Sequence, residues 1–177
     1  MNISSIDSFY FSLIRVIDAI YMDEEDLGDI LYFIVTLATE LTGAKGATIR
    51  VLAHGSLDLK VVASYGLSKT YLSSGAIDYG KSVTEIMQGD IIIVNDFDND
   101  PRIQNRPAAE AEGLCSVIGI PFTVSESAYS ILRVYFPSKK VPPQEEMDLL
   151  TSLGKLSCLA INNAIIGNLR DNTDAFK

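Results

Sequence analysis

The strongest constraint on the fold is the pairing of strand-like segments across short turns. Residues Ala47–Ala53 and Leu57–Tyr65 form two apolar, β-branched runs on either side of a turn. A second pair follows at residues 115–124 and 128–136, and a short run at Ile91–Val94 adds one more strand. Strands joined by hairpins rather than by crossover helices form antiparallel sheets. The pattern therefore predicts an α+β fold, in which helices pack against an antiparallel sheet.

Helical spacing of apolar residues marks the segments on both sides of these strands. Long helices are predicted at residues 4–22, at 27–42 with Gly43 as the C-terminal stop, and at 143–170. A short helix is expected at residues 107–113, within a polar connection. The chain is then predicted to contain an N-terminal helix at 1–23, one domain at 24–170 and a flexible tail at 171–177.

The terminal helices carry more apolar residues than one face of a sheet can cover. The residues outside the main stripes of the first two helices are Tyr10, Phe11, Ile14, Tyr32, Phe33 and Val35. A large exposed apolar patch is unusual on a monomer, and twofold symmetry is the commonest way of covering one. We therefore expect a homodimer built on residues 4–42 and 143–170.

Charge and composition narrow the class of protein. The net charge of −9 disfavours binding to nucleic acid or to an anionic membrane. No apolar run in the sequence suggests a membrane span, and the N-terminus lacks the positive start of a signal peptide, so a cytoplasmic location is expected. Two cysteines, Cys115 and Cys158, and a lone histidine, His54, predict neither a metal site nor histidine-based catalysis.

One segment raises the alternative of a nucleotide hydrolase. "GAIDYGKS", residues 75–82, fits the phosphate-binding pattern G-x-x-x-x-G-K-[ST], and the run ending at Asp96 could follow as a metal-holding strand. The pattern needs a buried strand before it and a long helix after it. Polar "LSKTYLSSG" precedes it, and Gly89 ends the following helix after roughly two turns. A P-loop enzyme therefore stays a remote alternative.

Several segments in succession resemble the GAF domain of bacterial sensory proteins. They are "VVASYGL" (61–67), the Gly80–Gly89 segment, "IIIVNDFDNDPR" (91–102), "EGLCSVIGIPF" (112–122), "ILRVYF" (131–136) and "LLTSLGKLSCLAINNA" (149–164). The resemblance covers about residues 25–167. It implies an antiparallel sheet of about six strands, with the terminal helices on one face. The other face would carry a pocket that the long connection covers.

The resemblance also implies a function and a set of candidate residues. It indicates a non-enzymatic sensory or regulatory domain of bacterial signal transduction, which binds a small molecule or a partner and signals through its terminal helices. The alternative is a ligand-free GAF fold that serves only as a dimerisation or interaction module. No cofactor is expected. The candidate pocket residues are Tyr79, Asp96, Phe97, Arg102, Cys115, Ser116 and Arg133.

Specialised branches of the family are disfavoured by what this chain lacks. Bilin-binding members carry a Cys-His pair, whereas Ser116 follows Cys115. The Asn-Lys-x-Phe-Asp-Glu signature of cyclic-nucleotide binders is absent, and the methionine sulfoxide reductases need several cysteines near the pocket. Family members also have glycines in the last hairpin, where this chain has Ser130. This departure predicts a smaller pocket.

The aspartate cluster at Asp96, Asp98 and Asp100 has the alternating spacing of a calcium loop. A calcium-binding EF-hand loop requires Gly at its sixth position and Glu at its twelfth, where this chain has Pro101 and Pro107. Capping of turns by the carboxylates is the better interpretation.

Arg50 and Arg133 lie in the middle of predicted strands, where a charge is costly unless it is paired. Two interpretations stay open. The arginines pair with helix acids such as Glu145 or Glu146, or they form an anion clamp in the pocket.

Overall fold

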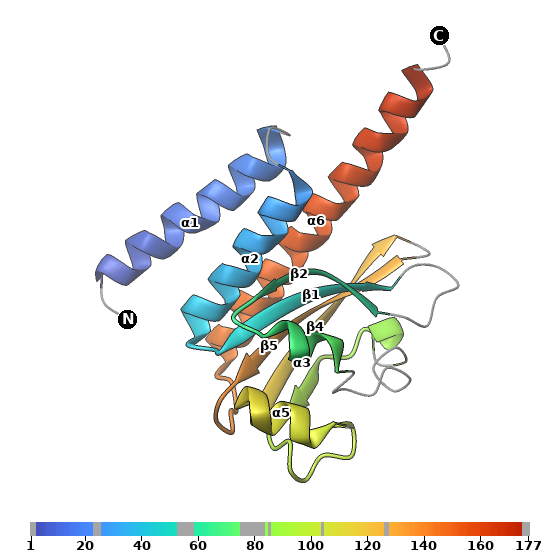
Figure 1. Cartoon of the computed structure of the whole chain (residues 1–177). Coiled ribbons are helices and arrows are strands. Elements are labelled where there is room, and N and C mark those ends of the chain that lie inside the picture. Colours follow the sequence, from blue (N-terminus) through green and yellow to red (C-terminus); the bar gives the residue numbers. More distant parts are fainter. Residues whose placement is uncertain are drawn as a thin grey trace.

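The computed structural model describes residues 3–22, 26–52, 59–74, 84, 86–103, 105–125 and 128–174. Two helices precede the first strand and one long helix follows the last, as Figure 1 shows. The elements are α1 (Ile3–Met22), α2 (Leu27–Thr42), β1 (Gly46–Leu52), β2 (Leu59–Tyr65), α3 (Lys69–Ser73), β3 (Ile92–Val94), α5 (Arg106–Glu112), β4 (Ser116–Ser125), β5 (Ala128–Phe136) and α6 (Gln144–Asp174).

The sheet is antiparallel throughout its described strands, in the order β2-β1-β5-β4-β3. This confirms the predicted fold class and all the strands that the residue pattern indicated. The expectation of about six strands was wrong for the described residues, which form five. The sixth strand came from the family resemblance alone, and no run of alternating residues in this chain supported it.

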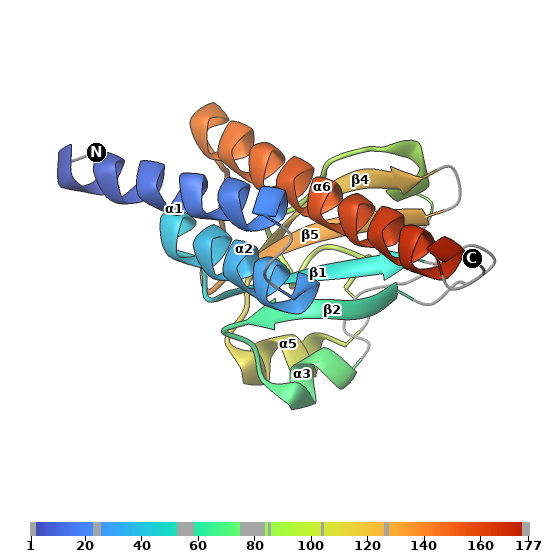
Figure 2. The same cartoon turned by 90° about the horizontal axis from the view of Figure 1, so that it is seen from above.

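One face of the sheet is covered by the terminal helices, as predicted. α2 and α6 lie against the strands, and α1 packs on α2 and α6 (Figure 2). The core between these layers includes Ile34 and Leu37 from α2, Leu132 from β5 and Leu153 from α6, all at most 5% exposed. α6 packs directly on the sheet at Gly154, where a Cβ would make an ordinary van der Waals contact of 3.4 Å with the Phe122 ring.

The second helix is more fully covered than its sequence suggests. Val35 is completely buried in the helix-side core, so the expectation that it lies on a surplus face was wrong. Phe33 is half-buried, and the guanidinium carbon of Arg15 in α1 lies 5.1 Å from the centre of its ring. Tyr32 is half-exposed and meets the ring of Tyr65 edge-on. α1 therefore covers part of the apolar surface of α2 that we expected a second copy of the chain to cover.

The opposite face of the sheet lies under α3, α5 and the connection between β3 and β4 (Figures 1 and 2). Asn105 begins α5 by accepting a hydrogen bond from the Ala108 N–H at 3.2 Å, and Gly113 ends the helix with a φ of 72°. These caps hold α5 against the sheet through Ala109 and Leu114, which are buried. The predicted short helix at 107–113 is confirmed within one residue.

The last helix is longer than expected. α6 continues to Asp174, so the predicted tail is helical from residue 171 to residue 174, and residues 175–177 lie outside the described part. Contrary to the sequence expectation, the stretch Gln144–Ile166 is long and apolar enough to cross a membrane by length and composition. A core helix passes the same test, and a third of this stretch is buried against the rest of the protein.

Candidate functional site

Both strand arginines point away from the terminal helices, into the face covered by α3 and α5. In the β1–β5 register Arg50 lies opposite Ile131, and Arg133 lies opposite Thr48. Residues directly opposite share a face, and residues two apart on a strand do too. Ile131 belongs to the core on the α3/α5 side, so Arg50 and Arg133 do as well.

The predicted pairing of these arginines with acids of the last helix was therefore wrong. Glu146 lies on the helix side, where its carboxylate pairs with the Lys140 ammonium at 2.8 Å. The alternation of a strand shows that Arg50 and Arg133 share one face of the sheet. It does not show which of the two faces the terminal helices cover.

The Arg133 side chain is almost completely buried, with 3% of its surface exposed to solvent. Its Nη2 atom is buried and has no hydrogen-bond partner, and the same holds for Oγ1 of Thr48 across the strand pair. On the other side of Arg133, the residue opposite is Gly119 of β4, which has no side chain. Arg50 is 6% exposed, and its Nη1 donates to the Leu59 carbonyl at 3.4 Å.

Tyr71 brings a further polar group to this face from α3. The side chain is 4% exposed, its hydroxyl has no hydrogen-bond partner, and its ring meets Tyr135 of β5 edge-on at 5.8 Å. Ser68 caps α3 by accepting from the Tyr71 N–H at 3.1 Å, and its own N–H donates to Glu112 of α5 at 2.8 Å. Tyr71 is thus held in place by both covering helices.

Burial, followed by the influence of Tyr135, raises the pKa of Tyr71 well above its ordinary value, although Arg133 and Arg50 oppose the shift. The phenol is therefore protonated at neutral pH and can donate a hydrogen bond. The face presents donors from Arg133, Tyr71 and Thr48. We call Thr48, Tyr71 and Arg133 the polar cluster.

The comparisons with known proteins agree with this architecture. The family model described as "GAF domain" matches residues 24–162. The chain belongs to the GAF domain family. Among curated proteins, none matches this GAF domain.

Solved GAF domains share the fold at low sequence identity. The phycoerythrobilin-bound GAF domain of a cyanobacterial phytochrome is 14% identical, with a TM-score of 0.69 over 90% of this chain and 97% of that one. The GAF domain of an Acinetobacter phosphoenolpyruvate-protein phosphotransferase is 18% identical, with a TM-score of 0.65 over 95% and 97%. Its counterpart from Coxiella burnetii is 16% identical, with a TM-score of 0.66 over 89% and 98%.

Two of the sequence-predicted site residues hold the β3–β4 connection of this GAF domain together. Arg102 forms a two-pronged ion pair with Asp100, through Nε at 2.9 Å and Nη2 at 2.6 Å, and also donates to the Ile93 carbonyl. Asp96 accepts from the Lys139 ammonium at 2.6 Å and from Asn99 at 2.7 Å. Asp96 thus ties the connection to the segment after β5. Asp96 and Asp100 also accept hydrogen bonds from the main-chain N–H groups of Asp98 and Arg102 at 3.2 and 2.9 Å, which agrees with the capping interpretation.

Phe97, Cys115 and Ser116 lie near this connection rather than beside Arg133. Phe97 is 3% exposed, and its N–H donates to the Cys115 carbonyl at 2.9 Å. Phe97 and Cys115 line a separate surface cavity of about 250 Å³, together with Arg106 and Glu110 of α5. Ser116 is buried and donates to the Ser138 carbonyl at 2.8 Å. The structure thus separates the predicted site into this loop region and the polar cluster.

Tyr79 and the phosphate-loop motif at 75–82 lie outside the described residues. The strand that follows them argues against a P-loop enzyme all the same. β3 pairs antiparallel with β4 at the sheet edge, whereas a P-loop needs a strand of a parallel sheet.

Ser130 does not narrow the pocket, contrary to expectation. It lies two residues from Leu132, on the helix side of β5, and its hydroxyl donates to the Arg50 carbonyl at 2.8 Å. Sequence reasoning missed Tyr71 and Thr48 altogether. Ser68, three residues before Tyr71, is a helix-capping signal that could have located α3, but no local signal shows that Tyr71 turns inward.

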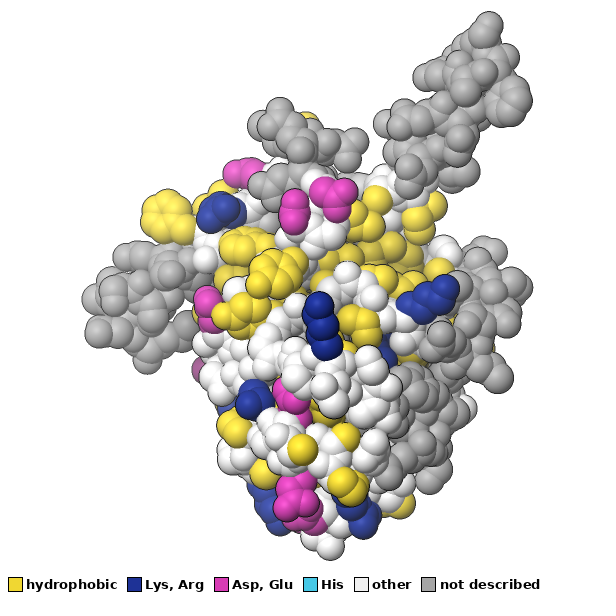
Figure 3. Space-filling view, in the orientation of Figure 1, with side chains coloured by type: hydrophobic (Ala, Val, Ile, Leu, Met, Phe, Trp, Pro, Cys, Tyr) yellow, Lys and Arg dark blue, Asp and Glu magenta, His cyan; other side chains and the backbone are white. Residues whose placement is uncertain are grey.

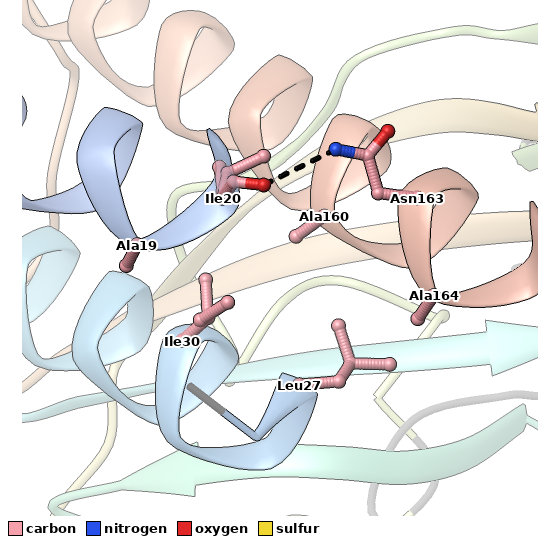
Figure 4. Close-up of a pocket in the computed structure, with 7 residues that line it drawn as sticks. All are labelled: Ala19, Ile20, Leu27, Ile30, Ala160, Asn163 and Ala164. Carbon is pink, nitrogen blue, oxygen red and sulfur yellow. Dashed lines mark hydrogen bonds between the residues drawn. The ribbon is translucent and has the colours of Figure 1, made fainter. Parts of the chain in front are cut away.

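A second, much smaller cavity lies where α1, α2 and α6 meet. It measures about 40 Å³ and is lined by Ala19, Ile20, Leu27, Ile30, Ala160, Asn163 and Ala164 (Figure 4). The Asn163 amide of α6 crosses this junction and donates to the Ile20 carbonyl of α1 at 3.3 Å. Small side chains and one polar link therefore join the two terminal helices.

Proposed function

We propose that this GAF domain is a non-enzymatic sensor, which binds a small molecule against the polar cluster and signals through α1 and α6. GAF domains are sensory and regulatory modules of signalling proteins. The observation that carries the proposal is the buried guanidinium of Arg133, whose Nη2 has no partner. Buried polar groups are nearly always hydrogen-bonded, so an exception in a core needs an explanation, and a bound ligand is the explanation that we propose for Arg133.

Binding accounts for the described residues better than catalysis does. Within the described part of the chain, no three His, Cys, Asp or Glu side chains lie close enough together to hold a metal ion. The Asp96 and Asp100 carboxylates are held by Lys139 and Arg102 in ion pairs of 2.6 Å. These carboxylates therefore stabilise a loop rather than stand ready to move protons.

A route for the signal runs through the sheet, which is one strand thick. β5 carries Arg133 on one face, while Leu132 and Val134 on the other belong to the core under the helices. A ligand that shifts β5 or β4 therefore moves the surface on which α6 packs. α6 extends beyond the sheet at its C-terminal end (Figure 1), in a position to pass that movement on.

The alternative function is a dimerisation module, and a separate observation favours dimerisation in either case. Apolar side chains gather over the terminal helices in Figure 3. The exposed ones on these helices are Phe11, Ile14, Ile17, Tyr21, Tyr32, Leu159, Ile165 and Ile166. We propose that α1 and α6 pair with a second copy, in a signalling protein of the bacterial cytoplasm.

Native mass spectrometry of freshly purified protein tests the sensory proposal. We expect a small molecule to be retained and to be lost on mild denaturation. A protein that retains nothing, and that shows no binding in a screen of metabolites by thermal melting, would leave the dimerisation module as the better account.

A further inference from the structure

We infer that the ligand carries an anionic oxygen group, either carboxylate or phosphoryl, which Arg133 binds together with Tyr71 and Thr48. This inference rests on the proposed function, that a small molecule binds at this face. It adds the chemical class of that molecule and the residues that select it.

The first argument is the charge of Arg133. The side chain is 3% exposed, and an isolated charge is far less stable in a protein interior than in water. Such a charge persists when an opposite charge and hydrogen bonds compensate it. Among the described residues, ion pairs join Arg102 to Asp100, Lys139 to Asp96 and Lys140 to Glu146, and none of these includes Arg133. A bound anion supplies the missing compensation.

The second argument is the arrangement of donors around the guanidinium. Thr48 lies directly opposite Arg133 on β1, and its hydroxyl is buried without a partner. Gly119 lies directly opposite on β4 and has no side chain there. Arginine N–H groups fan out in a plane and match the paired oxygens of carboxylate and phosphate groups. The hydroxyl of Thr48 can donate to the same oxygens.

Tyr71 supplies a third donor from above the sheet. Its hydroxyl is buried without a partner, and burial keeps its pKa high, so the proton stays on the phenol. Both Arg133 and Arg50 lie near enough to influence this pKa, which places two positive charges around the hydroxyl. The nearby Glu112 carboxylate is occupied by hydrogen bonds from the Ser68 N–H and hydroxyl. The site is positive and rich in donors although the whole chain is acidic.

Thermal melting of the full 177-residue chain tests the assignment. The probes are sodium phosphate, sodium acetate and the neutral isostere acetamide, at an ionic strength held constant with sodium chloride. We expect phosphate or acetate, at about ten times its Kd, to stabilise the fold by about 1.4 kcal/mol and so to raise the Tm by roughly 3–6 °C, and acetamide to have no effect. The stronger of the two anions distinguishes a phosphoryl ligand from a carboxylate ligand.

Arg133→Met removes the charge and keeps a long apolar stem. The variant should lose the anion-dependent shift, with a Kd weakened by about tenfold or more, and should melt no lower than wild type in anion-free buffer. Arg106→Met, at an exposed arginine of α5, is the matched control and should keep the shift. Tyr71→Phe keeps the ring packing on Tyr135 and should weaken binding several-fold, which answers the question if Arg133→Met does not fold.

The inference is overturned if neither anion acts beyond sodium chloride, or if Arg133→Met and Tyr71→Phe respond as wild type does. A neutral molecule retained equally by wild type and by Arg133→Met would overturn the anion assignment and leave the sensory function standing. A chain that binds neither anions nor any retained molecule would overturn both.

Discussion

Asn163 of α6 donates a hydrogen bond to the main-chain carbonyl of Ile20 in the last turn of α1, at 3.3 Å. The last carbonyls of a helix have no partner within it, so Asn163 satisfies one of them. The bond crosses the junction where α1, α2 and α6 leave a small cavity. Among the described residues, this hydrogen bond joins α1 to α6, the two helices that we propose carry the signal.

Replacing Asn163 should therefore loosen α1 without unfolding the domain. Asn163→Ala is expected to cost about 1 kcal/mol and to lower the protection of α1 amides against hydrogen exchange. Asn162→Ala is the matched control, because the Asn162 amide donates to the Cys158 thiol of its own helix at 3.6 Å. Equal exchange of α1 in both variants would show that apolar packing alone holds the helix.

The cap of α3 should determine how firmly Tyr71 is positioned. Ser68 accepts from the Tyr71 N–H, and both its N–H and its hydroxyl bond to Glu112. Ser68→Ala is expected to cost about 1–2 kcal/mol of stability and to weaken anion binding, since Tyr71 loses its support. Ser73→Ala is the control, because the Ser73 hydroxyl bonds to a carbonyl of its own helix, and it should stay within about 0.5 kcal/mol.

The ion pair of Asp96 with Lys139 predicts a dependence of stability on pH. The hydrogen bond from Lys139, followed by that from Asn99, lowers the pKa of Asp96. A carboxyl group whose pKa is lower in the folded state stabilises the fold above its unfolded pKa, about 3.9, and loses that contribution as the pH falls. Wild type should therefore lose Tm more steeply than Asp96→Asn as the pH falls below about 4.

The same pair should weaken at alkaline pH as well. The hydrogen bond to Asp96 raises the pKa of Lys139, so its contribution is present below the unfolded pKa, about 10.4, and is lost as the pH rises further. Asp90→Asn, which removes an exposed carboxylate six residues away, is the control for melting curves at both ends of the range. If the Tm of Asp96→Asn falls with pH as steeply as that of wild type at low pH, the prediction is wrong, and solvent screening removes the effect of this exposed ion pair.

The strands were predictable because their signals are local. β5 was predicted at residues 128–136 and lies there, and β1 and β2 differ from their predicted bounds by two residues at most. Alternation and short turns set these elements within a few residues of sequence. Gly43 ended the second helix as predicted, with a left-handed φ of 64°.

The candidate site was predictable only in part, because its decisive features are not local. Both faces of the β1–β5 pair are buried, one under the terminal helices and one under α3 and α5. The alternation of the strand therefore predicts that Arg133 is buried but not on which face. Arg102 was predicted to line the pocket, but its guanidinium forms an ion pair with Asp100, two residues away. The position of Tyr71 depends on how α3 docks on the sheet. The burial of Val35 depends on how α1, α6 and the sheet surround α2, which the sequence pattern of one helix does not show.

Association of two chains through the terminal helices is the remaining prediction. Phe11 is 70% exposed and Ile14 is 48% exposed on α1, and Ile166 is 49% exposed on α6. A stable interface needs about 800 Å² from each partner, and a few central residues of an interface contribute about 2 kcal/mol or more each. We expect wild type to be a dimer at micromolar concentration by analytical ultracentrifugation, and Phe11→Glu to weaken the dimer by at least about tenfold.

The choice of residue decides whether this experiment is informative. Phe33 is a poor choice, because it is half-buried beneath Arg15 and its replacement would disturb the monomer. Val141→Glu is a better control than a polar site, since Val141 is 79% exposed and apolar but lies outside the helices. A monomeric wild type, or a dimer that Phe11→Glu and Ile14→Glu leave intact, would contradict pairing through α1. In that case α6, with Leu159 and Ile165 exposed, would be the face to test next, by Ile165→Glu.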